Sequence, residues 1–170
     1  MQYTMEEMKG FSVIGFQRVI PYERGYQDCP AFWSEIVGTH MGPIARRGGP
    51  ETELERAICE NSIGELGVCI CEDDQAFRYL IAGFYQGGPV PEGLTLFTFP
   101  DMTWAKFTTH GKMPQSLQAL NTELFTRWIP ENREYDFAMR ANIEWYSRGD
   151  MDSEDYECGI WVPVRGKKPV

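Results

Sequence analysis

Apolar residues along this chain form short runs whose β-branched and aromatic content is typical of strands. The segment FSVIGFQRVI at 11–20 is such a run and ends before Pro21. Two further runs, at 65–73 and 77–86, lie on either side of a short polar turn and predict a β-hairpin. Later strands are predicted within 94–111, where Pro100 breaks the run, and at 133–149 and 156–164.

Helical spacing of apolar residues occurs in other segments. In CPAFWSEIVG at 29–38, Pro30 suits a first helical turn and Gly38 suits the end of a helix. In the segment 114–130, leucines and a tryptophan form one stripe, and Pro130 is expected to end the helix. Between these lies the mixed segment 39–63, longer than a simple link requires, in which ETELERAICE resembles a short amphipathic helix. We expect this segment to form a lid or an extra helix.

The order of the predicted elements is strand, helix, strand, strand, and it occurs twice. The stretch GGPVPEG at 87–93 separates the two halves. No amino-acid repeat accompanies the pattern. Two such units predict an α+β fold in which antiparallel sheet carries one helix in each half.

The composition excludes some classes of function. A chain of 170 residues is expected to form a single domain, 1–170, and its net charge of −9 offers few phosphate contacts. No long basic run is present, so direct binding of nucleic acid is not expected. Aromatic residues make up 14% of the chain, and such residues line pockets for flat ligands as well as cores.

Five cysteines, an odd number, favour free thiols in a reducing compartment. The first residues show no signal-peptide pattern, and no apolar run is long enough to span a membrane. We therefore expect a cytoplasmic protein that does not enter the membrane. Cys69 and Cys71 have no second pair at zinc-site spacing, so no metal and no other cofactor is predicted.

One acidic residue is conspicuous in the strand pattern. With a period of two, Ile143 and Trp145 share the face expected to be the core face, and Glu144 and Tyr146 share the other. The simplest interpretation places Glu144 on a solvated outer face beside Arg140 or Arg148. However, the neighbouring predicted strands are apolar on both faces, which favours a lined hollow. A carboxylate there is costly unless it is hydrogen-bonded or compensated by a bound cation.

Six segments in this order resemble a known family. They are FSVIGFQ, PAFWSEI, FRYLIAGFY, MTWAKFTTHGKMPQSLQALNTELFTRWIPEN, IEWY and GIWVPV. Together they resemble the gyrase-inhibitor-like small-molecule-binding domain, the effector-binding module of AraC-type and MerR-type bacterial regulators. The resemblance covers about residues 8–166. No helix-turn-helix is expected before it, because the chain begins shortly before the first predicted strand.

The resemblance implies two pseudo-twofold-related units with a central ligand cleft. It places Glu144 at the floor of an aromatic pocket, where that acid commonly counters the charge of lipophilic cations. The candidate ligand contacts are Glu144, Tyr146, Trp33, Tyr79, Trp104, Phe107 and Trp161. From the pattern alone, each of these aromatic residues is either core or pocket lining, and the resemblance places the helix of Trp33 at the cleft mouth.

Two other functions stay open at this point. One branch of the fold hydrolyses cyclopropane-bearing toxic compounds, and Glu144 and Tyr146 would then be the catalytic pair. Alternatively, the acidic chain would act as an inhibitory protein-interaction module on a topoisomerase. We expect a hydrophobic or cationic small molecule as the partner. A homodimer or a separately encoded protein partner stays open, and His110 is expected in a turn.

Overall fold

The structure, a computed structural model, describes residues 1–168. The chain forms two compact units. The first unit contains Met1–Gly10 and the chain from Phe99 onward, and the second contains Phe11–Thr98. Each unit has its own antiparallel strands and helices, and each is described by itself below.

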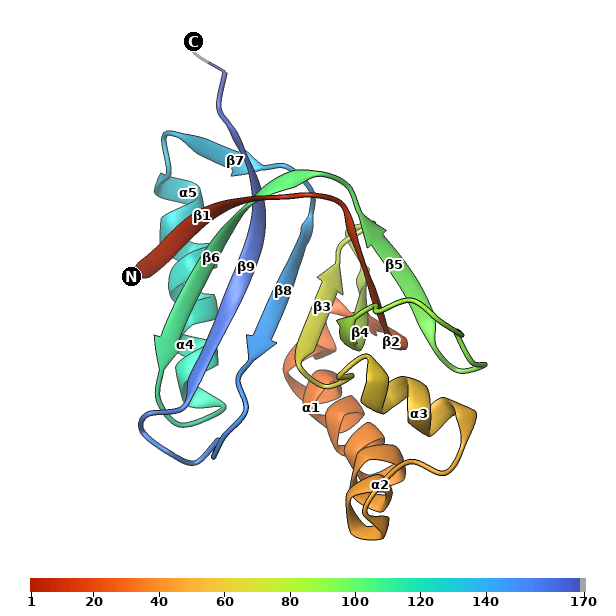
Figure 1. The fold of residues 1–170 in the computed structure, drawn as a ribbon. Helices are drawn as coiled ribbons and strands as arrows, with labels where there is room; N and C mark the ends of the chain where they lie inside the picture. The colour runs from red at the N-terminus through yellow and green to blue at the C-terminus, as the bar shows by residue number, and fades with distance from the viewer. Residues whose placement is uncertain (169–170) are drawn as a thin grey trace. The chain divides into compact units, whose positions relative to one another are not determined.

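The second unit contains the predicted strand-helix-strand-strand order (Figure 1). Strand β4 pairs with β2 on one side and with β3 on the other, all antiparallel, and β5 follows β2 in the strand order. The elements are β2 (Phe11–Pro21), η1 (Tyr22–Arg24), α1 (Gly25–Ile36), the π-helical turn η2 (Val37–Met41), α2 (Gly42–Arg47), α3 (Glu53–Glu60), β3 (Leu66–Ile70), β4 (Ala76–Phe84) and β5 (Thr95–Phe99).

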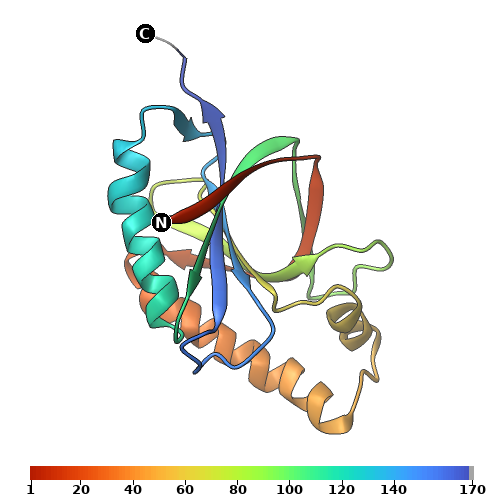
Figure 2. The ribbon, with the colours of Figure 1, turned by 60° about the vertical axis from the view of Figure 1, so that its left-hand side comes forward.

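The first unit repeats this order with additions at its edges. Its strands lie in the order β1-β6-β9-β8, and β7 also pairs with β9. The helix α4 lies along one face of these strands (Figure 2). The elements are β1 (Gln2–Met8), β6 (Met102–His110), α4 (Gln115–Glu123), the π-helical turn η3 (Leu124–Trp128), α5 (Ile129–Glu131), β7 (Tyr135–Phe137), β8 (Ala141–Tyr146) and β9 (Glu157–Gly166).

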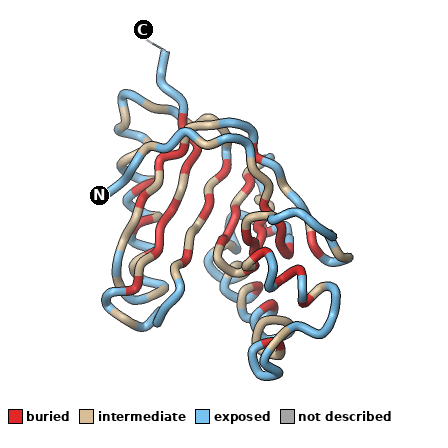
Figure 3. Tube along the Cα trace, in the orientation of Figure 1, coloured by how far each residue is buried: buried red, intermediate tan, exposed pale blue. Residues whose placement is uncertain are grey.

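Buried residues follow the strands, whereas β1 and the loops are largely exposed (Figure 3). In the second unit, Phe16 and Ile81 of neighbouring strands meet Phe32 and Ile36 of α1 in one core cluster. In the first unit, Leu124 and Phe107 are fully buried. The predicted α+β fold with antiparallel sheet is therefore confirmed.

Several predicted boundaries are wrong. Helix α1 begins at Gly25, so Pro30 lies inside it and not in its first turn. Arg24 and Asp28 explain the early start, because the guanidinium donates two hydrogen bonds, of 3.0 and 2.9 Å, to the carboxylate one turn later. Gly38 does not end the helix, since the chain continues through η2 into α2.

Three more differences concern the first unit. The predicted strand 133–149 is two strands, β7 and β8, which pair with different parts of β9. The helix predicted to end at Pro130 continues through α5 to Glu131. Strand β1 was not predicted at all, although it pairs with β6 from Gln2 to Met8. Its residues are mostly polar and exposed, so they carry no apolar alternation.

The segment 39–63 forms α2 and α3 and is fastened by a capping box. The backbone N–H of Glu55 donates to Oγ1 of Thr52 at 3.1 Å, and that of Thr52 donates to Oε1 of Glu55 at 3.2 Å. Arg47 of α2 donates a hydrogen bond to the other carboxylate oxygen. This bond is the main reason why the pKa of Glu55 is lowered. The ionised Glu55 carboxylate therefore stabilises the fold, and this stabilisation is lost as the pH falls through its lowered pKa.

We expect Thr52→Ala to destabilise the chain, because it removes the acceptor for the Glu55 N–H. The loss of an N-cap hydroxyl costs about 1 kcal/mol. For a chain of this size, that lowers the melting temperature by roughly 2–4 °C. Thermal unfolding followed by circular dichroism measures the change. Ser34→Ala, at an exposed position within α1, is the control and should leave the melting temperature unchanged. Equal melting curves for Thr52→Ala and wild type would show that the box does not stabilise the fold.

Candidate functional site

Glu144 and Tyr146 form a hydrogen-bonded pair on β8. The Tyr146 hydroxyl donates to Oε2 of Glu144 at 3.1 Å. Tyr146 is buried and Glu144 is half-buried. Residues two apart in a strand project to the same face, which brings the two side chains together. The hydrogen bond then orients the carboxylate. The sequence pattern correctly placed these two side chains together.

The face that carries this pair is the one covered by α4. In the register of β8 and β9, Glu144 is opposite Ile160 and Tyr146 is opposite Cys158. The Cys158 thiol lies 3.8 Å from the hydroxyl of Ser116, a residue of α4. The sequence pattern predicts that the face of Ile143 is the core face and that Glu144 faces away from it. Helix α4 instead covers the face of Glu144, so this expectation is wrong for the helix-covered face. Ile143, on the other face of β8, is fully buried as well.

The surroundings of Glu144 favour neutral forms of neighbouring acids. Burial raises the pKa of the Cys158 thiol, and the negative charge of Glu144 raises it further, although the Ser116 hydrogen bond opposes both. Burial likewise raises the pKa of Tyr156, whose hydroxyl donates to the backbone oxygen of Ser147 at 2.9 Å. The thiol of Cys158 is therefore a neutral packing group and not an activated nucleophile.

Trp161 lies on the opposite face of the same strands. It is opposite Lys106 on β6 and Ile143 on β8, one position out of phase with Glu144. The Lys106 ammonium lies 3.8 Å from the centroid of the Trp161 ring and 2.6 Å from Oε2 of Glu6. The chain's own cation thus occupies one face of this ring. A ligand-binding role for Trp161 stays a prediction.

Trp104 and Phe107 are fully buried within the first unit. The Phe107 ring lies 4.9 Å from that of Trp128 in η3 and 5.0 Å from that of Tyr3 in β1. The Trp104 ring packs edge-on against Phe99, with the ring centroids 5.2 Å apart. The role of Trp104 and Phe107 as ligand contacts stays a prediction.

Trp33 and Tyr79 meet in the second unit. The indole N–H of Trp33, on α1, donates to the Tyr79 hydroxyl of β4 at 2.8 Å. Tyr79 is buried and Trp33 is half-buried against the core cluster. This bond satisfies two polar groups that burial would otherwise penalise. A ligand-binding role for either residue stays a prediction.

Five of the seven predicted residues fall into three groups: Glu144 with Tyr146, Trp161 with a lysine, and Trp33 with Tyr79. The other two, Trp104 and Phe107, pack against different rings. Sequence reasoning missed Lys106 and Glu6, which are brought together by the pairing of β1 with β6. No local motif marks them, because their contact depends on that register. His110 ends β6 instead of lying in a turn, and its Nε2 is 2.9 Å from a carboxylate oxygen of Glu157.

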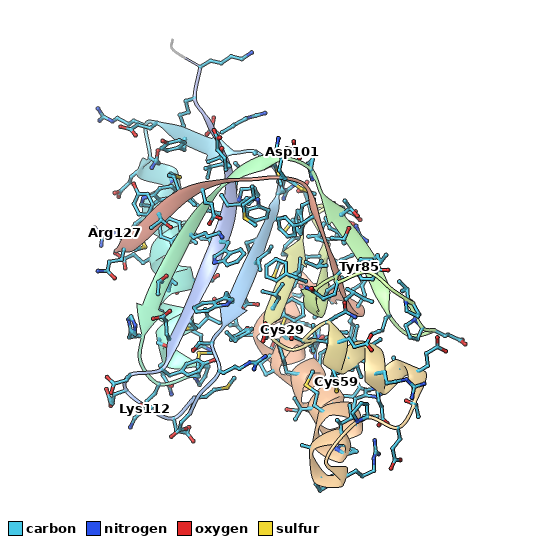
Figure 4. All side chains as sticks on the ribbon, in the orientation of Figure 1. Cys29, Cys59, Tyr85, Asp101, Lys112 and Arg127 are labelled. Atoms are coloured by element: carbon cyan, nitrogen blue, oxygen red, sulfur yellow. The ribbon has the colours of Figure 1, made fainter. Side chains whose placement is uncertain are left out.

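The cysteines and helices add little chemistry. None of the five cysteines, all of which lie within residues 1–168, forms a disulfide; Cys29 lies on α1 and Cys59 on α3 (Figure 4). Within residues 1–168, no cluster of three or more His, Cys, Asp or Glu side chains is arranged to hold a metal ion. Among the same residues, no helix has both the length and the apolar character needed to cross a membrane.

Comparison with known proteins identifies the family. The family model of Cass2, the integron-associated effector-binding protein, matches residues 4–164. The chain belongs to this family. The transcriptional regulator BrlR of Pseudomonas aeruginosa PAO1 is 32% identical over 173 residues, which cover 96% of this chain and 56% of BrlR. The chain thus spans little more than half the length of this relative. Its relation to the effector-binding domains of transcription regulators, and the resemblance to gyrase-inhibitor-like domains, are confirmed.

Solved structures show the same fold as this Cass2-family chain. SAV2435, solved with tetraphenylphosphonium bound, gives a TM-score of 0.75 at 20% identity and covers 97% of this chain and 94% of its own. The integron cassette protein VCH_CASS2 of Vibrio cholerae gives a TM-score of 0.64 at 17% identity, covering 96% and 95% of the two chains. At these identities, the likeness concerns the fold alone.

Proposed function

We propose that this chain binds lipophilic, cationic small molecules and that Glu144 supplies the negative charge that recognises them. The observation that carries the proposal is the half-buried Glu144 carboxylate, held by the Tyr146 hydroxyl on the helix-covered face of the strands. An effector-binding family supports this function, and so does a protein of the same fold solved with a phosphonium cation.

The physical argument starts from the cost of burying charge. A carboxylate removed from water loses solvation, so a bound cation beside it is favoured. Tetraphenylphosphonium has no hydrogen-bond donor, and its charge is spread beneath four phenyl rings. A protein can therefore recognise it only through apolar contact and electrostatic attraction. Glu144 offers the attraction, and the ring of Tyr146 offers an aromatic surface beside it.

We expect tetraphenylphosphonium to bind and its neutral relative triphenylphosphine oxide to bind at least about tenfold more weakly, a difference of roughly 1.4 kcal/mol. Isothermal titration calorimetry with the purified chain measures both affinities. Native mass spectrometry of the freshly purified protein would show whether a cationic ligand is retained from the cell. Equal affinities for the two compounds would show that charge does not contribute and would overturn the proposal.

A further inference from the structure

A cavity lies wholly within the second unit, whereas Glu144 belongs to the first. Its volume is about 210 Å³, and it opens between β2, α1 and the π-helical turn η2. This is smaller than the roughly 300–1,000 Å³ of pockets for drug-sized ligands, so it suits a molecule of about one ring. We call it the edge cavity. The lining residues that matter are Phe16, Arg18, Phe32, Glu35, Thr39 and His40.

The wall of the edge cavity is aromatic. The rings of Phe16 and His40 are stacked, with centroids 4.8 Å apart and planes inclined by 19°. Phe16 is buried in the core cluster, whereas His40 is half-buried at the cavity. Among residues 1–168, no side chain or backbone group forms a hydrogen bond with either ring nitrogen of His40. A π-helical turn within a helix often marks a functional site, and η2 is the element that carries His40 here.

The rim of the edge cavity is polar and rich in donors. The Arg18 guanidinium lies 4.3 Å from the Phe32 ring centroid, and its Nη2 donates to Oε2 of Glu35 at 2.5 Å. A guanidinium carries five N–H donors, so this single bond leaves most of them available. The Glu35 carboxylate is already engaged by Arg18. An anion would accept hydrogen bonds from the remaining N–H groups of Arg18, in competition with Glu35.

The first unit has an aromatic pair at the corresponding position. There, Phe107 of β6 meets Trp128 of the π-helical turn η3, as Phe16 of β2 meets His40 of η2, although Phe107 and Trp128 are edge-on at 77° and Phe16 and His40 are stacked. A third ring, Tyr3 of β1, contacts both, with centroids 5.0 and 5.3 Å away. In the second unit, the residues that precede the edge strand β5 bring no ring: Leu94 joins the core cluster, and Gly93 lines the edge cavity without a side chain.

We propose that the edge cavity binds a small planar aromatic carboxylate. The ring lies against the Phe16–His40 pair, in the manner of Tyr3 in the first unit, and the carboxylate accepts hydrogen bonds from Arg18 and from the N–H of His40. This site is separate from Glu144 and does not depend on the function proposed for it. The class of ligand follows from the charge of the donors and from the size of the cavity.

Three probes of one shape test the charge. Benzoate, benzamide and benzamidinium share a ring and a planar three-atom head, with charges of −1, 0 and +1. We expect benzoate to give saturable shifts of the Arg18, Thr39 and His40 amide signals in ¹⁵N-labelled protein. We expect benzamide to bind about tenfold more weakly and benzamidinium to give no saturable shift at these positions. Equal affinities, tighter binding of benzamidinium, or the absence of benzoate shifts at millimolar concentrations would overturn the proposal.

Two variants of opposite sign then test the residues. Arg18→Gln should weaken benzoate about tenfold and leave benzamide nearly unchanged. Glu35→Gln removes the competing carboxylate and should tighten benzoate, a gain that a folding defect cannot produce. Arg127→Gln, at an exposed arginine of the first unit, is the control (Figure 4). If Arg18→Gln and Arg127→Gln reduce benzoate binding equally, or if Glu35→Gln weakens it, the proposal is wrong.

Discussion

Glu144→Gln is expected to weaken the binding of tetraphenylphosphonium about tenfold or more and to leave triphenylphosphine oxide nearly unaffected. The substitution keeps the shape of the side chain and an oxygen that accepts the Tyr146 hydrogen bond, and it removes only the charge. At a separation of about 6 Å and an effective dielectric constant of about 20, the attraction is roughly 3 kcal/mol before desolvation is subtracted. A net effect of about 1–3 kcal/mol corresponds to a loss of tenfold or more.

The matched control is Glu157→Gln. Glu157 is a half-buried carboxylate on the neighbouring strand β9, paired with His110, and its register places it on the face opposite Cys158 and Glu144. The Glu157→Gln substitution should change the affinity for tetraphenylphosphonium by less than about twofold, as expected for a screened charge. Equal losses for the two variants would show that only the overall charge matters. Loss of the neutral ligand as well would show that Glu144→Gln disturbs the fold.

The same variant separates binding from hydrolysis. If Glu144 activated water against an electrophilic compound, Gln would leave the binding of that compound largely intact and abolish its turnover. If Glu144 recognises charge, the variant loses affinity for cations and no turnover is present to be lost. Titration calorimetry and a product assay on one preparation of wild type and Glu144→Gln distinguish the two.

Local sequence patterns predicted the elements whose signals are local. The hairpin of β3 and β4 was predicted from two apolar runs and a polar turn, in which Asp73 accepts hydrogen bonds from the N–H groups of Gln75 and Ala76 at 2.7 and 2.9 Å. Strand β1 was not predicted because it is stabilised by its pairing with β6 and has no apolar face of its own. Alternation of apolar and polar residues indicates that one face of a strand is buried, and an exposed edge strand has few buried residues.

The candidate site was predicted only as far as a single strand determines it. The period of two placed Glu144 beside Tyr146, and the hydrogen bond between them agrees. The opposite placement of Trp161 depends on the register of β8 with β9, in which Ile143 and not Glu144 is its partner. A shift of one residue in that register would exchange the faces. Pairing between distant strands decides such shifts, and one sequence does not reveal it.

Gly83→Ala is expected to destabilise the fold by about 3 kcal/mol or more, which exceeds the cost of losing the Thr52 cap. A Cβ at Gly83 would collide with the backbone oxygen of Asn61 and would lie 2.8 Å from that of Ser62. Asn61 cannot move away cheaply. Its side chain donates to the Ala57 oxygen at 2.9 Å and accepts the Gln86 N–H at 2.8 Å, which fixes the end of α3 against β4.

For a chain of this size, such a loss lowers the melting temperature by roughly 6–12 °C, which thermal unfolding followed by circular dichroism measures. Gly38→Ala is the control for the loss of a glycine. No atom lies within 4 Å of a Cβ built at Gly38, and the residue lies in the helical turn η2, so the variant should be neutral or more stable by about 0.5–1 kcal/mol. If Gly83→Ala unfolds at the temperature of the Gly38→Ala variant, the loop of Asn61 does not rest on β4 as closely as the structure places it.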